Sequence, residues 1–291
     1  MNSKSISEMR ARRVALPSRG GEMAVLDFGP ADRPVDVIFS HANGFNALTY
    51  RSILGPLVHD YRILAIDLRG HGASRLPAVT EGRTDWRDFR DDLVALLAAE
   101  ITAPVVMAGH SMGGTSSLLA AARAPLNVKA LALFDPVLSD VARMALIDRT
   151  NPLAEGAVRR RSLFASKADV IAAYTGRGAF RTWHAEQLAD YVEAGFRKVP
   201  DGQVTLTCDP AWEASNFNTH GSDAWAALRA LDCPVRVLRA EIGSTARIDD
   251  NLDKLGAMDH VTVEVIPGTT HFLPMERPDL VCDVLRQMVD A

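Results

Sequence analysis

The most informative segment of this 291-residue chain is Val105-Val106-Met107-Ala108-Gly109-His110-Ser111-Met112-Gly113-Gly114. It reads as a short apolar strand that ends in the pattern G-x-S-x-G and continues into a helical segment rich in Ala and Leu. In that context the pattern predicts a tight strand-to-helix turn, whose glycines let neighbouring backbone approach closely. The turn places Ser111 at a helix N-terminus, where unpaired N–H groups and the helix dipole stabilise a developing negative charge. Ser111 is therefore the candidate nucleophile.

Short apolar runs of the same kind recur along the chain and alternate with helical segments. Each run is too short for a core helix and is apolar on both faces, as buried parallel strands are. The predicted strands cover residues 35–39, 63–66, 105–108, 130–134, 235–239 and 261–266. The predicted helices cover residues 48–58, 86–99 with Asp85 as N-cap, 112–122 and 278–289, and residues 14–16 and 23–28 form an expected edge hairpin. This alternation predicts the α/β class, with a mostly parallel twisted sheet flanked by helices.

The alternation stops between residues 139 and 222, which predicts an inserted helical cap. Helical pieces are expected at residues 159–164, 168–174 and 183–196, and a strand at residues 203–207. The core would then consist of residues 1–138 and 223–291, interrupted by the cap at residues 139–222. We expect the cap to cover the carboxyl ends of the strands and to set the choice of substrate.

Composition indicates a folded protein and argues against several classes of partner. Apolar residues are 47% of the chain and charged residues 23%, as in globular proteins. The net charge is −4 and the charges are dispersed, so nucleic acid is not an expected partner. The three cysteines, Cys208, Cys233 and Cys282, lack zinc-like or C-x-x-C spacing. The polar N-terminal segment does not resemble a secretory signal, and no apolar segment reaches about 18 residues, so we expect a cytoplasmic protein without a membrane span.

The serine needs a base to take its proton near neutral pH, and His271 is the candidate. It lies in the segment Pro267-Gly268-Thr269-Thr270-His271-Phe272-Leu273-Pro274-Met275-Glu276-Arg277-Pro278, directly after the last predicted strand. Loops at the carboxyl ends of parallel strands are where such sheets place their chemistry. We therefore expect Ser111 and His271 to meet at one edge of the sheet.

With two further motifs, the chain resembles the α/β-hydrolase family over nearly all of its length outside the cap. These motifs are Ser40-His41-Ala42-Asn43-Gly44-Phe45 and Asp67-Leu68-Arg69-Gly70-His71-Gly72-Ala73-Ser74. The order of Ser before His agrees with that family. The resemblance implies an esterase- or lipase-like serine hydrolase with no metal and no organic cofactor. It also implies an oxyanion hole built from the backbone N–H groups of Met112 and Asn43, with Gly44 as an alternative loop donor. His41-Ala42 departs modestly from the family's usual His-Gly.

The position of the acid departs from the usual family pattern. Gly243 stands where an aspartate commonly follows the seventh strand, whereas Asp135 ends the sixth, where some family members carry the acid. We favour Asp135, which would hold His271 in the correct tautomer and stabilise the imidazolium. Glu241 is the second candidate, followed by Asp249 or Asp250.

Pocket-lining residues are expected beside these motifs and in the cap. Phe45, His41 and Phe272 are predicted to line the pocket, and His41 is further expected to organise the oxyanion loop; His71 could border the same pocket. Cap aromatics that could form walls are Phe164, Tyr174, Phe180, Trp183, Tyr191, Phe196, Trp212 and Phe217. Arg159-Arg160-Arg161 is interpreted as a solvated helix face rather than a site for an acidic group, and residues 67–74 as a structural turn rather than a phosphate cradle.

These observations predict a hydrolase of small or medium carboxylic esters that works through an acyl-enzyme. The expected partner is a small ester-like molecule. Lactone hydrolysis, carbon–carbon bond hydrolysis and prolyl-peptide hydrolysis stay open as alternatives, the last with Glu186, Glu193 or Glu213 as the amine-binding acid. A non-catalytic receptor on the same scaffold is the alternative from another class.

Overall fold

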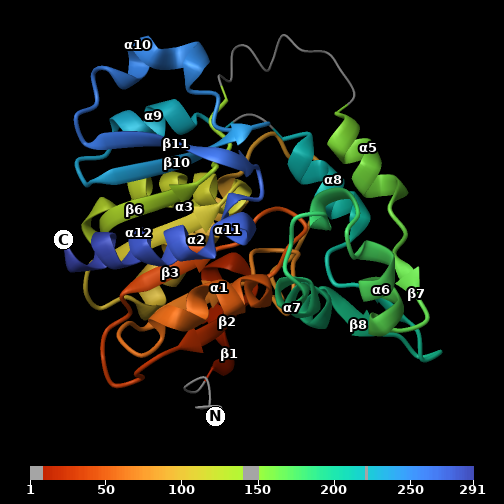
Figure 1. Ribbon diagram of the computed structural model, residues 1–291. Helices are drawn as coiled ribbons and strands as arrows, with labels where there is room; N and C mark the ends of the chain where they lie inside the picture. The colour runs from red at the N-terminus through yellow and green to blue at the C-terminus, as the bar shows by residue number, and fades with distance from the viewer. Residues whose placement is uncertain (1–8, 140–150, 220–221) are drawn as a thin grey trace, which may run out of the picture.

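A mostly parallel, eight-stranded sheet forms the centre of the computed structural model, which describes residues 9–139, 151–219 and 222–291 (Figure 1). The strand order across the described part of this sheet is β1-β2-β4-β3-β5-β6-β10-β11. Their bounds are β1 Arg10–Leu16, β2 Gly21–Phe28, β3 Val37–Ser40, β4 Ile63–Ile66, β5 Val105–His110, β6 Val128–Phe134, β10 Val235–Ile242 and β11 Val261–Thr270. β1 and β2 form the predicted antiparallel hairpin, β2 is antiparallel to β4, and the other neighbours are parallel. The predicted α/β-hydrolase fold is confirmed.

Helices cover both faces of the sheet because its strands are apolar on both sides. The main helices of this core are α1 Arg51–Leu54, α2 Arg87–Glu100, α3 Met112–Arg123, α9 Ala224–Arg229, α10 Leu252–Leu255, α11 Leu273–Glu276 and α12 Pro278–Asp290. Short 3₁₀ turns lie at Pro17–Arg19, Ala47–Tyr50, Gly55–Leu57, Pro125–Asn127 and Asp249–Asn251. No helix among the described residues has the length and apolar character that crossing a bilayer requires.

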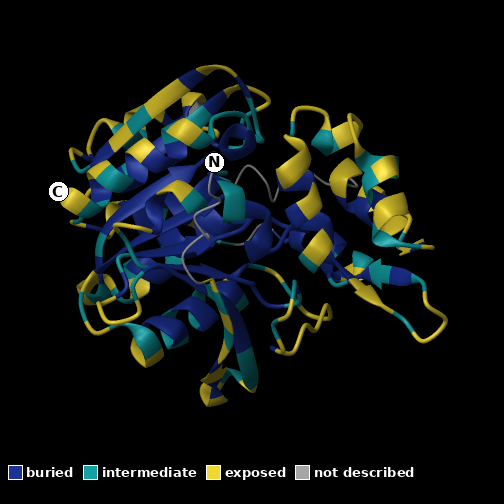
Figure 2. Ribbon diagram, turned by 60° about the horizontal axis from the view of Figure 1, so that its bottom comes forward, coloured by how far each residue is buried: buried dark blue, intermediate teal, exposed yellow. Residues whose placement is uncertain are grey.

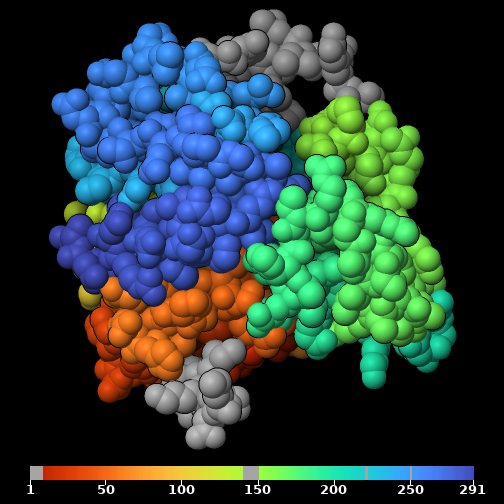
Figure 3. All heavy atoms as spheres, viewed as in Figure 1, coloured from red at the N-terminus to blue at the C-terminus, as the bar shows by residue number. Residues whose placement is uncertain are grey.

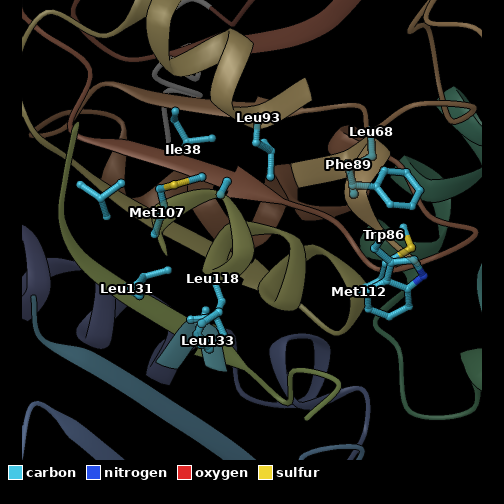
Figure 4. Close-up of a cluster of buried hydrophobic side chains, with 14 of the residues drawn as sticks. Ile38, Leu68, Trp86, Phe89, Leu93, Met107, Met112, Leu118, Leu131 and Leu133 are labelled. Atoms are coloured by element: carbon cyan, nitrogen blue, oxygen red, sulfur yellow. The ribbon is translucent and has the colours of Figure 1, made fainter. Parts of the chain in front are cut away.

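Alternate side chains of β5 enter two separate cores. Val105 and Met107 pack with α2, α3 and α9 on one face (Figure 4), whereas Val106 and Ala108 pack with α1 and α12 on the other. Figure 2 shows the result as buried strands between helices that expose only their outer sides. The carboxyl ends of β3, β5, β6 and β11 are thereby held rigidly in register, and it is from these ends that the candidate site is built.

A second lobe, seen in green beside the rest of the molecule in Figure 3 and called the cap below, is formed by elements between residues 151 and 219. It contains α5 Pro152–Arg159, β7 Leu163–Phe164, α6 Lys167–Tyr174, a 3₁₀ turn at Gly178–Phe180, α7 Ala185–Gly195, β8 Phe196–Lys198, β9 Val204–Leu206 and α8 Pro210–Phe217. β7, β9 and β8 form a small antiparallel sheet. The cap boundaries near residues 139 and 222 stay a prediction, since residues 140–150 and 220–221 lie outside the described part of the chain.

Three predicted elements differ from the structure for identifiable reasons. The helix expected at residues 159–164 is wrong: α5 ends at Arg159, and Leu163–Phe164 pairs with β9 instead. The helix expected at residues 48–58 is divided into the 3₁₀ turn Ala47–Tyr50, α1 and the 3₁₀ turn Gly55–Leu57. The last of these turns contains Pro56, which cannot donate a backbone hydrogen bond to continue α1. Asp85 lies one residue before the N-cap Trp86, although its carboxylate still accepts the N–H of Arg87 at 2.9 Å.

Close contact between α3 and the end of β3 requires a glycine at position 113. A Cβ there would lie 2.3 Å from the carbonyl oxygen of Ser40 and 2.4 Å from that of His41. Both atoms belong to backbone, which cannot rotate away. We predict that Gly113→Ala lowers the free energy of unfolding by about 3 kcal/mol, as measured by urea denaturation.

Gly156→Ala is the matched control for this prediction. Gly156 is also helical, but a Cβ on it would meet nothing within 4 Å. The gain in helix propensity should raise the free energy of unfolding by about 0.5–1 kcal/mol. Equal effects of the two substitutions would contradict the proposed contact between α3 and β3.

Candidate active site

The turn between β5 and α3 holds Ser111 in a strained backbone conformation. Its φ of 54° lies in the left-handed region, and Ser111 and Asp135 are the non-glycine residues with positive φ in the described ranges. The turn is so tight that a Cβ on Gly109 would lie 2.6 Å from the carbonyl carbon of Gly113. Strain of this kind persists where the surrounding structure enforces it, and it projects the serine above the sheet.

His271 meets the serine across the carboxyl edge of the sheet. It follows β11 directly, and its Nε2 lies 3.0 Å from Ser111 Oγ. The backbone carbonyl of His271 accepts a hydrogen bond of 2.7 Å from Nε2–H of His110, the residue before the serine. This bond connects the loop that carries Ser111 with the loop that carries His271. The structure therefore brings Ser111 and His271 into contact, as the sequence predicts.

Asp135, at the end of β6, completes the row of hydrogen bonds. Its Oδ2 lies 2.6 Å from His271 Nδ1 and its side chain is fully buried. Oδ1 accepts bonds from Ala240 N–H at 2.8 Å and from the Ser244 hydroxyl at 2.6 Å. Burial raises the pKa of Asp135, but the bonds from His271, Ser244 and Ala240 outweigh it and hold that pKa below its ordinary value. The group is a carboxylate that keeps the proton of His271 on Nδ1, leaving Nε2 as an acceptor for the serine.

The other carboxylates considered for this position lie elsewhere. Glu241 is exposed and accepts the N–H of Gly268 at 2.8 Å. Asp249 forms an ion pair of 2.6 Å with Arg239, and the side chain of Asp250 lies outside what the structure describes. The structure brings Asp135, and neither Glu241 nor Asp249, to His271.

The loop after β10 contributes in a way that the sequence did not reveal. Ser244 donates its hydroxyl to Asp135, and the backbone N–H of Thr245 donates to Asp135 Oδ2 at 3.0 Å. This is the loop in which the family usually carries its acid; here it supplies donors to an acid from the neighbouring strand. The sequence signal that could have predicted these donors is Gly243-Ser244-Thr245, a glycine and two hydroxyl residues directly after a strand.

Among residues 42–45 of the loop after β3, one backbone N–H group has no acceptor in the described part of the chain. Ala42 N–H donates to the Tyr50 hydroxyl at 3.2 Å, Gly44 N–H to His71 Nε2 at 3.1 Å, and Phe45 N–H to the Ala42 carbonyl at 3.1 Å. Within the described residues the N–H of Asn43 has no such acceptor. The alternative that Gly44 is the loop donor is therefore corrected, because its N–H is already bound to His71.

Met112 offers a second unpaired donor close to this loop. It is the first residue of α3, where a backbone N–H has no acceptor within the helix. Gly113, the next residue, lies against the carbonyl groups of Ser40 and His41. The start of α3 thus adjoins the loop that carries Asn43, which is the arrangement that a two-donor oxyanion hole needs.

Two buried histidines fasten the loops beneath the site. His41 Nε2 accepts the N–H of Leu68 at 2.9 Å, so Nδ1 carries the proton and donates to the Ala42 carbonyl. His71 accepts from Gly44 and donates through Nδ1 to the Arg69 carbonyl at 2.9 Å. The prediction that His41 lines the pocket is corrected: it has no exposed surface and both its nitrogens bind backbone. Its expected part in organising the loop agrees with these contacts.

His110 is a third buried histidine that connects two loops, the loop after β3 and the loop that carries His271. The Tyr50 hydroxyl, which accepts from Ala42, donates to His110 Nδ1 at 2.8 Å, and Nε2–H donates to the His271 carbonyl. Burial lowers the pKa of His110 to about 3 and that of His71 to about 4, and it holds the pKa of His41 well below its ordinary value. Protonation of any of the three would remove an acceptor on which the loops depend.

Aromatic side chains from the core and the cap gather next to His271. The rings of Phe45 and Phe272 lie 6.3 Å apart, and Phe272 is 5.7 Å from the ring of His271. From the cap, Trp183 lies 5.0 Å from Phe45 and Tyr191 lies 5.7 Å from it. Phe180 lies 5.0 Å from Trp183 and 5.1 Å from Tyr191, and with Tyr174, Phe196 and Phe164 it extends this cluster into the cap. Two cap aromatics pack elsewhere: Trp212 on Phe89 and Phe217 on α5.

The charged groups considered for substrate recognition mostly have partners in the protein. Arg160 is bound to Glu213 at 2.6 Å, and Arg161 lies over the ring of Phe164. Arg159 pairs with Glu155, and Glu193 pairs with Lys167 at 2.9 Å; Glu186 is exposed. No group of three or more His, Cys, Asp or Glu side chains in the described ranges has the arrangement of a metal site.

Comparisons with known proteins bear on the family and fold of this chain. A family model described as "Alpha/beta hydrolase family" matches residues 37–284. The chain is similar to 2-(acetamidomethylene)succinate hydrolase of Mesorhizobium japonicum, at 25% identity over 88% of each chain. It is also similar to (E)-2-((N-methylformamido)methylene)succinate hydrolase of Acinetobacter baylyi, at 20% identity over 88% of this chain and 90% of that protein. The crystal structure of an E-2-(acetamidomethylene)succinate hydrolase superposes with a TM-score of 0.82, covering 98% of this chain and all of that one at 22% identity.

The buried histidines predict a loss of stability in mild acid. Because His41, His71 and His110 have lowered pKa values in the folded state, the unfolded chain binds protons near pH 6.5 that the folded protein does not. The free energy of unfolding should therefore fall by about 2 kcal/mol per histidine between pH 8 and pH 5, or about 6 kcal/mol for the three. Urea denaturation at a series of pH values measures this slope. Asp135 adds to the loss only below about pH 4, because its folded pKa is depressed.

Replacing one of these histidines should reduce that slope by about one third. His71→Gln removes a buried titrating ring, whereas His59→Gln removes an exposed one and should leave the slope unchanged. The comparison uses the slope rather than the absolute stability, so a general destabilisation of His71→Gln does not affect it. An unchanged slope in His71→Gln would contradict the assignment of His71 as a neutral ring in the folded protein.

Proposed function

The chain belongs to the alpha/beta hydrolase family, and we propose that it is a serine hydrolase that cleaves small or medium carboxylic esters through an acyl-enzyme. One observation carries the proposal: Ser111 Oγ, both ring nitrogens of His271 and the carboxylate of Asp135 form one continuous row at 3.0 and 2.6 Å. The receptor alternative drew its support from the absence of an acid after the seventh strand. The contact between Asp135 and His271 removes that support.

Acylation begins with transfer of the Ser111 proton to His271 Nε2 as the oxygen attacks the substrate carbonyl. Asp135 keeps the other ring proton on Nδ1 and stabilises the imidazolium that forms. The carbonyl oxygen becomes negative in the tetrahedral intermediate, where the N–H groups of Asn43 and Met112 would bind it. One such donor lowers the barrier by about 2.7–4 kcal/mol.

His271 then acts as an acid and as a base in turn. It gives its proton to the leaving alcohol, which departs as the acyl–Ser111 ester forms, and it next removes a proton from the water that attacks this ester. Phe45 and Phe272 adjoin His271 with Trp183 and Tyr191 and would provide an apolar surface for the acyl group. The same cycle needs neither a metal nor an organic cofactor.

Substitution of the three residues tests the proposal. Ser111→Ala and His271→Ala should abolish hydrolysis of p-nitrophenyl acetate, because each removes a group that reacts. Asp135→Asn should lower kcat by about 10⁴, since the ring then adopts the wrong tautomer. Glu241→Gln is the control and should retain full turnover, because that exposed carboxylate binds Gly268 instead. Near-normal turnover in Ser111→Ala would exclude a serine mechanism.

An acyl–nitrogen bond is the second candidate for the scissile bond. Its support is the similarity to two relatives that are named as methylenesuccinate hydrolases and that match this chain over 88% of its length. The mechanism would be unchanged, except that His271 would protonate a leaving nitrogen instead of an oxygen.

A substrate panel distinguishes the two candidates. We expect kcat/KM for p-nitrophenyl esters of acetate to octanoate to exceed that for 2-(acetamidomethylene)succinate by at least about 10², as measured by absorbance at fixed enzyme concentration. The reverse order would replace the ester by the acyl–nitrogen bond, with the same residues. Ser111→Ala, run beside each substrate, separates enzymatic from spontaneous hydrolysis.

A further inference from the structure

Helix α8 of the cap packs directly on the loop that carries Asn43. The indole N–H of Trp212 donates to the Arg69 carbonyl at 2.9 Å, which ties the start of α8 to the loop after β4. The carboxylate of Glu213 lies against Gly44, where a Cβ would be 2.5 Å from Oε1. The backbone carbonyl of Glu213 accepts a bond of 3.0 Å from the side-chain amide of Asn43. Helix α8 therefore contacts the oxyanion loop through both the backbone and the side chain of Glu213.

Asn216, one turn further along α8, is the centre of this contact. It is fully buried, and its Nδ2 donates to Asn43 Oδ1 at 2.8 Å. Its Oδ1 accepts from Arg83 Nη1 at 2.7 Å, and its backbone carbonyl accepts from the indole N–H of Trp86 at 3.2 Å. Arg83 and Trp86 belong to the core segment that leads into α2. Asn216 thus connects the core on one side with the oxyanion loop on the other.

These bonds leave the Asn43 side chain no freedom while its backbone N–H stays available. Both ends of its amide are bound to α8, Oδ1 to Asn216 and Nδ2 to the carbonyl of Glu213. The neighbouring N–H groups of Ala42 and Gly44 are held by Tyr50 and His71, whereas that of Asn43 has no acceptor in the part of the chain that is described. A residue that is tied through its side chain and unpaired through its N–H is suited to present that N–H to a ligand.

We propose that Asn216 is a positioning residue for oxyanion stabilisation, acting through the side chain of Asn43. The inference rests on the proposed function, because it assumes that an oxyanion forms at Ser111. A donor contributes to the rate only when its direction is set before the charge develops. Loss of the bond from Asn216 would free the Asn43 side chain and let its N–H turn away from the reacting oxygen, while Ser111, His271 and Asp135 keep their contacts.

Phosphonylation of Ser111 tests this role without knowledge of the natural substrate. The second-order rate constant with a fluorophosphonate probe is measured for the wild type, Asn216→Ala, Asn43→Ala and the double variant. We expect both single variants to react about 10- to 100-fold more slowly than the wild type. The double variant should be no slower than either single variant, because both changes break the same tether. With an activated ester, kcat should fall and KM should change less than two-fold.

Ser215→Ala is the matched control on the same helix. Ser215 also accepts from Arg83 Nη1, at 2.8 Å, and its hydroxyl donates to the Trp212 carbonyl; Asn43 is not among its partners. It should react at within two-fold of the wild-type rate if Asn216 acts through Asn43, and as slowly as Asn216→Ala if α8 merely needs its anchor to Arg83. Asn43→Ala leaves the bond between Arg83 and Asn216 in place, so it reports on the tether even if Asn216→Ala does not fold.

Three outcomes would overturn the role of Asn216: a rate for Asn43→Ala within two-fold of the wild type, additive effects of the two changes, or equal losses in Ser215→Ala and Asn216→Ala. The failure of the proposed function looks different. In that case the wild type itself does not react with the probe, or Ser111→Ala reacts as fast as the wild type.

Discussion

The hydrogen bond between the buried Asp135 carboxylate and His271 Nδ1 sets the orientation of the imidazole toward Ser111. A carboxylate without exposed surface stays ionised only where donors surround it, and here Ala240, Ser244 and Thr245 supply them. Two neighbouring parallel strands, β6 and β10, bring the acid and its donors together. The register between β6 and β10 therefore fixes the position of the carboxylate beside the imidazole. A change in that position would disturb the sheet.

Neutral histidines give the same edge of the sheet its rigidity. His41, His71 and His110 each donate from one nitrogen and accept at the other, so each spans two loops that start from different strands. Burial keeps these rings uncharged, and only a neutral ring can do both. His271 lies close by but contacts side chains at both nitrogens, the Asp135 carboxylate at Nδ1 and the Ser111 hydroxyl at Nε2. Four histidines within one region thus divide into three that connect loops through neutral rings and one that lies between Ser111 and Asp135.

The cap contributes to the geometry of the core as well as to its cover. α7 and α8 bond to the loops after β3 and β4 through Asn46, Asn43 and Arg69, and to the segment after His271 through the Met275 carbonyl. The candidate oxyanion loop is thereby enclosed between the sheet and α8. Under the proposed function, substitutions in α8 are expected to change turnover, because the side chain of Asn43 is held from the cap side.

Local patterns in the chain were enough to predict the fold and two members of the candidate site, Ser111 and His271. Short apolar runs that alternate with helical segments leave few alternatives to a parallel sheet, and the glycines around Ser111 and the loop after the last strand are local signals that survive in any tertiary context. Where local preference was weak, the prediction failed: the chain leaves α5 after Arg159, and Arg160 binds Glu213 while Phe164 is buried among other aromatic rings.

Contacts between distant segments were needed to identify the acid that faces His271 and to distinguish Asn43 from Gly44 as the residue whose N–H has no acceptor among the described residues. Several carboxylates follow strands in this sequence, and spacing cannot tell which of them points inward, since that depends on register between strands far apart in the chain. Likewise, the sequence predicts Asn43 as the loop donor with Gly44 as the alternative, and the N–H of Gly44 is taken up by His71, from the loop after β4. Local patterns encode where the chain turns, whereas partners that are distant in the sequence select among the groups presented at each turn.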